Sequence, residues 1–110
     1  MKIITGLPER EGWHLREGMP IQVGIKSGAT PFSGPHLHRT MTEYFYLLEG
    51  EISLRVDRKA ITVGKGDLVV VEPGEAHEVL SASPDALLLL LMPPFVAGDK
   101  QELEEPERQK

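Results

Sequence analysis

The stretch PHLHRTMTE, residues 35–43, decides the interpretation of this chain. Its two histidines, His36 and His38, are two positions apart, so on an extended strand both imidazoles point to the same face. Glu43 follows after four further residues, which is enough for a turn into a second strand, and there it shares a face with Phe45. We therefore expect two imidazoles and one carboxylate to meet inside a β structure.

A third histidine ends the stretch GDLVVVEPGEAH, residues 66–77. If the chain is extended after Pro73-Gly74, His77 shares a face with Val79. An unpaired carboxylate in an apolar interior is costly, and neutral imidazoles do not remove that cost, whereas a divalent cation does. Imidazole nitrogens and a carboxylate oxygen suit Mn, Fe, Co, Ni, Cu or Zn. The sequence therefore predicts one divalent transition metal, with positions left for water, substrate or oxygen, on the ligands His36, His38, Glu43 and His77.

The rest of the chain reads as short strands, because brief apolar runs are separated by many of the 11 glycines and 9 prolines. We expect a strand over residues 21–27 with Ile21, Val23 and Ile25 on its buried face. Residues 43–48 and 52–56 are expected to form a hairpin. Residues 86–92 are apolar throughout, and we interpret them as a strand covered on both faces, because the flanking prolines leave too little room for a helix.

Both stretches resemble the two sequence motifs of the cupin family. Residues 35–50 have the complete ligand spacing of the first motif, with six residues between Glu43 and Gly50. Residues 66–77 have the Gly-Asp turn, the Pro-Gly corner and the third histidine of the second. The resemblance implies an all-β fold, a double-stranded β-helix or jelly-roll barrel, with the metal inside one end on the four matching positions. It also implies a homodimer, which we expect to form through sheet edges, since alternation points Tyr44 and Tyr46 outward.

The domain organisation follows from length and composition. With 110 residues the chain has room for one domain, and we expect the barrel to occupy residues 1–98. Residues 99–110 have almost nothing to bury and are predicted to be an acidic, disordered tail. His14 is interpreted as an ordinary surface or interface histidine and Trp13 as a packing residue. Parity and closeness to the motifs give the expected pocket walls, with Phe95 an option at the mouth: Ile25, Phe32, Met41, Phe45, Leu47, Val79 and Met92.

Charge and composition exclude several classes of function. A net charge of −5 opposes binding to nucleic acid or to anionic membranes. No cysteine is present, so disulfides and thiolate metal sites are excluded. The longest apolar run is far shorter than the ~20 residues of a membrane span, and we expect a cytoplasmic protein.

Two functions remain for a small-molecule ligand. The favoured hypothesis is a metalloenzyme with dioxygenase-like or isomerase-like chemistry at the three-histidine, one-glutamate metal. The alternative is a non-catalytic, metal-stabilised protein that binds or senses a small molecule. Sugar-nucleotide isomerase chemistry needs acid–base partners beside the sugar, and no second inward histidine is expected to supply one. The sequence assigns no catalytic residue.

Overall fold

The computed structural model describes residues 1, 3–15 and 20–104, and most of these residues lie in β-strands. Apart from one short 3-10 helix near the N-terminus, the regular elements in this part of the chain are strands. The elements are η1 (Leu7–Glu9), β1 (Gly12–Leu15), β2 (Gln22–Ser27), β3 (His36–His38), β4 (Glu43–Glu49), β5 (Glu51–Val56), β6 (Lys59–Gly64), β7 (Leu68–Val71), β8 (His77–Ala82), β9 (Leu87–Met92) and β10 (Lys100–Glu102).

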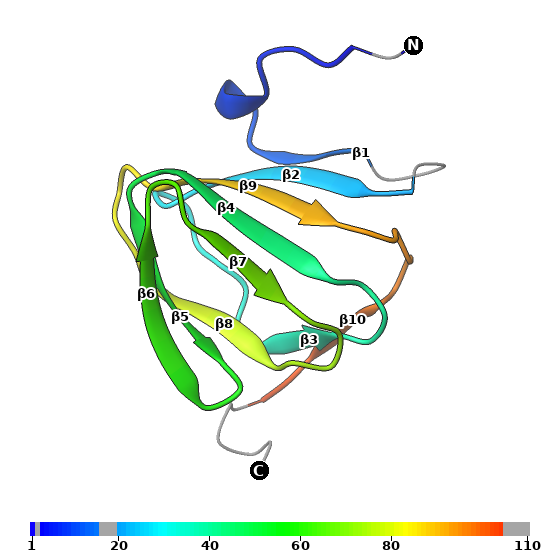
Figure 1. Cartoon of the computed structure of the whole chain (residues 1–110), viewed down its shortest axis with the longest axis vertical. Coiled ribbons are helices and arrows are strands. Elements are labelled where there is room, and N and C mark those ends of the chain that lie inside the picture. Colours follow the sequence, from blue (N-terminus) through cyan, green and yellow to red (C-terminus); the bar gives the residue numbers. More distant parts are fainter. Residues whose placement is uncertain (2, 16–19, 105–110) are drawn as a thin grey trace.

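The strands form two five-stranded sheets that face each other (Figure 1). The first sheet has the order β1-β2-β9-β4-β7 and the second has the order β10-β3-β8-β5-β6. The chain passes repeatedly from one sheet to the other, for example from β2 to β3, from β3 to β4 and from β8 to β9. This is the double-stranded β-helix that the sequence predicted.

The predicted hairpin between residues 43–48 and 52–56 is wrong. β4 pairs with β7 and β9 in the first sheet, whereas β5 pairs with β6 and β8 in the second. Gly50 is the corner between the two sheets, and its φ of +72° is costly for any residue with a side chain. A Cβ atom there would lie 2.6 Å from the Cα of Ala86. The glycine therefore allows a change of sheet where alternation alone suggests a simple turn.

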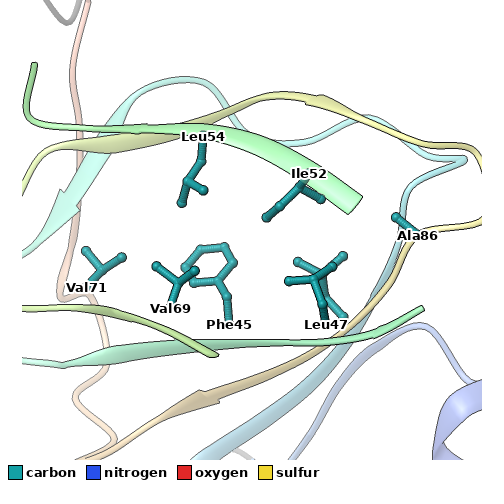
Figure 2. Close-up of a cluster of buried hydrophobic side chains, with 8 residues drawn as sticks. Phe45, Leu47, Ile52, Leu54, Val69, Val71 and Ala86 are labelled. Atoms are coloured by element: carbon teal, nitrogen blue, oxygen red, sulfur yellow. The ribbon is translucent and has the colours of Figure 1, made fainter. Parts of the chain in front are cut away.

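One half of the barrel is a closed apolar core (Figure 2). Ile52 and Leu54 point from the second sheet toward side chains of the first sheet. Leu47, Leu54 and Leu88 have no exposed surface at all. The complete cluster of buried side chains is Phe45, Leu47, Ile52, Leu54, Val69, Val71, Ala86 and Leu88. β9 is the central strand of the first sheet, so its prediction as a strand is confirmed, although its outer face is only half-buried.

The interior face of β2 differs from the expectation. Its register pairs Gln22 with Met92 and Gly24 with Leu90, which places Gln22 and Gly24 on the interior side. A Cβ atom on Gly24 would lie 2.6 Å from the Trp13 ring, so the indole of β1 fills the place of a side chain there. Ile25 is nevertheless buried as predicted, at 3% exposure, and Gln22 is 6% exposed. Both faces of the strand are covered, and alternation could not tell them apart.

The boundary expected at Gly98 also differs from the structure. Asp99 is only 5% exposed, and Lys100–Glu102 pair with β3 as an edge strand of the second sheet. Backbone pairing does not need apolar side chains, which is why composition gave no sign of β10. Leu103 donates its backbone N–H to the carbonyl oxygen of Pro35 at 3.0 Å. Residues 105–110 of the expected tail lie outside the described residues.

The outer face of the first sheet carries apolar side chains. Tyr44 pairs with Val70 and Tyr46 pairs with Leu68. Tyr46, Leu68 and Val70 are 37%, 56% and 42% exposed, whereas Tyr44 is half-buried. The outward direction expected for both tyrosines agrees with this register. None of the helices in the described part of the chain has the length and apolar character needed to cross a membrane.

Candidate metal centre

Three strands bring the predicted ligands to one end of the barrel. β3 supplies His36 and His38, β4 begins at Glu43 and β8 begins at His77. His36 and His77 are directly opposite each other in the register between β3 and β8, so their imidazoles share a face of the second sheet. Glu43 comes from the first sheet. The cluster therefore joins the two sheets.

The four side chains lie close together. One nitrogen from each histidine and one oxygen of Glu43 all lie within 4.8 Å of one another. The Nε2 atoms of His38 and His77 are each 3.1 Å from the same oxygen, Oε1 of Glu43. His38, Glu43 and His77 are 5%, 5% and 3% exposed, and His36 is half-buried. All four residues predicted as metal ligands thus belong to one compact, mostly buried group.

Backbone carbonyls orient two of the imidazoles. The Nδ1 atom of His36 lies 2.8 Å from the carbonyl oxygen of Gly34, and the Nδ1 atom of His77 lies 3.0 Å from that of Glu75. Because a carbonyl only accepts, Nδ1 carries the hydrogen and Nε2 is left for the interior. The Nδ1 atom of His38 is the one buried side-chain polar atom without a hydrogen-bond partner in the described part of the chain.

In the metal-free protein the electrostatics favour the deprotonated forms of His36 and Glu43, which metal binding needs, but not that of His77. Burial lowers the pKa of His36 to about 4, and the ammonium of Lys100 acts in the same direction. Burial raises the pKa of Glu43, but hydrogen bonds from His38 and His77 outweigh it and the pKa falls to about 2. Burial lowers the pKa of His77, yet its interactions with Glu43 raise it overall. Near neutral pH, Glu43 is an anion and His36 a neutral donor, which fits a divalent transition metal.

Asp99 fixes the loop between the two ligand strands, and the sequence analysis missed it. Its carboxylate accepts hydrogen bonds from the backbone amides of Thr40, at 2.9 and 3.0 Å, and of Met41, at 2.8 Å. Burial raises the pKa of Asp99, but these hydrogen bonds outweigh it and keep the pKa below its usual value. Because this loop joins His38 to Glu43, the hydrogen bonds of Asp99 fix the connection between these two candidate ligands.

A cavity of about 940 Å³ opens from this cluster. All four ligand residues line it, as do most of the expected wall residues: Ile25, Phe32, Met41, Phe45, Val79, Met92 and Phe95. Leu47 does not line the cavity. It has no exposed surface and belongs to the closed core, one inward step along β4 beyond Phe45. Parity gave the correct face of the strand, but not the depth at which the cavity ends.

Several cavity residues were not predicted. Trp13 and His14 both line it, although His14 was interpreted as an ordinary surface histidine. An irregular register between Trp13 and Leu15 leaves His14 as an extra residue opposite β2, and no motif announces such a bulge. Gln22 and Lys100 line the cavity as well. The only available signal for Lys100 would have been its alternation with Gln101 on an unexpected strand.

Comparison with known proteins supports the fold and the motifs. A family model described as the cupin domain matches residues 23–93. An uncharacterized protein of Methanocaldococcus jannaschii is 31% identical over 71 residues, which cover 63% of this chain and 57% of that protein. The chain therefore spans little more than half the length of this relative.

Solved structures give the same picture at low sequence identity. A Planctomyces limnophilus protein has a TM-score of 0.72 and 15% identity, covering 93% of this chain and 97% of that chain. A Klebsiella pneumoniae protein with a double-stranded β-helix domain has a TM-score of 0.69 and 16% identity, with coverage of 96% and 100%. A predicted oxalate decarboxylase of Thermotoga maritima has a TM-score of 0.56 and 21% identity, with coverage of 67% and 64%. Since the family model spans more than half of the sequence and both motifs lie within it, this chain belongs to the cupin family.

Proposed function

We propose that this cupin is a metalloenzyme that converts a small molecule at a divalent transition metal. The observation that carries the proposal is the position of the ligand group at the wall of a cavity of about 940 Å³. A purely structural metal site is normally closed by protein ligands, whereas a catalytic site keeps access for a substrate. Here four protein ligands face a space that is large enough for a small organic ligand.

In this proposal the residues around the cavity have three different roles. His36, His38, His77 and Glu43 would hold the metal, which when bound supplies Lewis acidity and, for iron or manganese, redox capacity. Phe32, Phe45, Val79 and Met92 form the apolar side and would exclude water from the body of the substrate. Gln22 is a buried amide on the same cavity and can orient a polar substituent.

Dioxygenase-like oxidation or isomerisation is the chemistry that we propose for this site. Both reactions use a metal that keeps positions free for small ligands, and both suit a dry cavity with one polar end. The Thermotoga maritima neighbour, which is 21% identical, is described as a predicted oxalate decarboxylase. It is a precedent for a carboxylate substrate on this fold. His14 lies on the cavity and offers a proton-transfer group for isomerisation that the sequence analysis did not expect.

The test compares metal-loaded and metal-free protein. Purified chain is loaded with Mn, Fe, Co, Ni or Zn, its metal content is measured, and molecules released on denaturation are identified by mass spectrometry. Dioxygen uptake and product formation are then followed with any recovered molecule. We expect about one metal per chain and turnover by the loaded protein alone. Absence of metal under all loading conditions would contradict the proposal.

A non-catalytic binding or sensor function is the second candidate. It is favoured by the bonding of the acidic groups on the cavity, because Asp99 is occupied by backbone amides and Glu11 by Lys26 and Thr30. Few proton carriers then remain for catalysis. Recovery of a tightly bound molecule that every metal form leaves unchanged would support this candidate against the enzyme.

We also propose that a second copy of this chain pairs with the β7 edge of the first sheet. β7 is the last strand of that sheet, and an edge strand offers free backbone groups to another chain. Its outward side chains, Leu68 and Val70, continue the apolar face of Tyr46. A twofold pairing would bury this patch against itself. Sedimentation should show a dimer for the parent chain and a monomer for Val70→Lys, and a monomeric parent at micromolar concentration would contradict the pairing.

A further inference from the structure

Two lysines line the cavity, and their surroundings differ. Lys26 is 18% exposed at its side chain, and its ammonium lies 3.4 Å from the Glu11 carboxylate. It also donates to the carbonyl oxygens of Ser27 and Thr30, at 2.9 Å each, and it lies 4.2 Å from the centre of the Phe32 ring. The charge of Lys26 is therefore balanced within the protein, and its role is to hold the loop after β2.

The charge of Lys100 is balanced less closely, because its partner carboxylate is distant and solvent-exposed. In the register of β10 with β3 it lies opposite His38, so its side chain is on the same face of the sheet as this ligand. Its ammonium donates to the hydroxyl of Ser33 at 3.1 Å, and its ion-pair partner is the carboxylate of Glu102, which is 3.9 Å away and 75% exposed. The same ammonium lowers the pKa of His36. The positive charge of Lys100 therefore acts on the group of candidate metal ligands.

The charges on the cavity wall indicate which ligand fits. Three carboxylates, Glu11, Glu43 and Asp99, and two ammonium groups, Lys26 and Lys100, line the cavity. With neutral imidazoles these five groups sum to −1, and a bound divalent metal changes the sum to +1. Glu11 and Asp99 are occupied by the protein, as described above. The surplus positive charge lies between the ligand group and Lys100, where an anion is favoured over a neutral molecule or a cation.

We propose that the substrate is a small carboxylate with an apolar or aromatic body, and that Lys100 is its counter-charge. The body lies against Phe32, Phe45 and Val79, and the carboxylate faces the ammonium of Lys100. This inference deepens the proposed function, because the surplus charge depends on the bound metal. Strand β10, which carries Lys100, thus takes part in substrate binding.

The experiment measures binding of benzoate and of its neutral counterpart benzamide to zinc-loaded protein by titration calorimetry. The parent chain should bind benzoate at least about tenfold more tightly than benzamide. Lys100→Met should weaken benzoate binding about tenfold or more, which is the scale of one charge-assisted hydrogen bond, and should leave benzamide unchanged. Lys100→Arg should retain most of the affinity. Lys65→Met is the matched control, since Lys65 is 69% exposed and pairs with Glu49 on another part of the surface.

Zinc content and melting temperature of each variant separate the two levels of the proposal. Equal benzoate affinity of the parent and Lys100→Met, with zinc retained in both, would overturn the Lys100 subsite and leave the metal centre standing. A parent chain that holds zinc but does not prefer benzoate to benzamide would overturn the substrate class. A chain that binds no zinc would overturn the metalloenzyme. If benzoate binding in that chain were still lost on Lys100→Met, Lys100 would be an anion site that does not need the charge of the metal.

Discussion

The two ends of the barrel use the same strand alternation for different purposes, and β4 runs through both. On its inward face Glu43 belongs to the candidate metal centre, Phe45 lies between this group and the core, and Leu47 is buried in the core. At the closed end each inward side chain is satisfied by apolar neighbours. At the open end the inward side chains are ionisable, and hydrogen bonds or a metal must satisfy them. The alternation determines which side chains of a strand point inward. The residues packed around them determine whether that interior is an apolar core or a cavity with ionisable groups.

Shortening a side chain at the closed end should affect stability alone. Leu47→Ala creates a cavity in a site with no exposed surface, so we expect a loss of about 2–5 kcal/mol in the free energy of unfolding. Metal content per folded chain should not change. Denaturant unfolding and elemental analysis measure both quantities. Leu80→Ala, at a position that is 42% exposed, is the control and should cost about 1 kcal/mol or less. A loss of metal in Leu47→Ala would show that the two ends are coupled.

Removing a predicted metal ligand at the open end should affect metal binding most strongly. His38→Ala should lower the metal affinity by about 100-fold or more, because even partners behind the ligands are worth 10–100-fold. In denaturant unfolding the metal-free variant should be less stable than the metal-free parent by about 1–3 kcal/mol, because the contact between Nε2 of His38 and Oε1 of the buried Glu43, at 3.1 Å, is lost. Competition with a chelator measures the affinity. Unchanged metal binding would remove His38 from the ligand set.

Asp99 tests the connection between β10 and the ligands. Asp99→Ala leaves the amides of Thr40 and Met41 without their buried acceptor, so we expect a loss of about 1–3 kcal/mol in unfolding free energy. The loop that sets His38 against Glu43 should loosen, with metal affinity falling about tenfold. Glu102→Gln, on the adjoining strand β10, is the matched control, because its carboxylate is 75% exposed. Equal metal affinity for Asp99→Ala and the parent would limit Asp99 to a purely structural role.

Sequence alone could predict the parts of this molecule that repeat every second residue or occur in a motif. The inward face of β4, the ligand spacing and the fold class are of this kind. The rest depends on contacts between distant segments. The bulge at His14 is visible only against β2, and β10 is a strand only because β3 offers it an edge. Gly50 has no room for a side chain because Ala86, distant in sequence, lies close by. No local pattern in residues 99–102 distinguishes this docked strand from a solvated tail.

The smallest expected effect is the pH dependence of the open end, and its sign differs between the metal-free and metal-bound forms. In the metal-free protein the pKa of His77 is raised above 6.5, so its contribution to stability is present below pH 6.5 and is lost as the pH rises through the folded value. His36 acts in the opposite sense, because its pKa of about 4 makes stability fall between pH 6.5 and pH 4. Glu43, with a pKa of about 2, matters only below about pH 4.5. These opposed contributions of His36 and His77 should leave the metal-free melting temperature nearly flat from pH 8 to pH 5.

Metal binding requires all three imidazoles to be deprotonated, so the stability that it adds should be complete at pH 8 and should shrink as the pH falls below about 6. Melting temperatures of both forms at pH 8, 6.5 and 5, with metal content measured in parallel, check this. If the difference between the two forms stays constant over that range, imidazole ligation is not its origin.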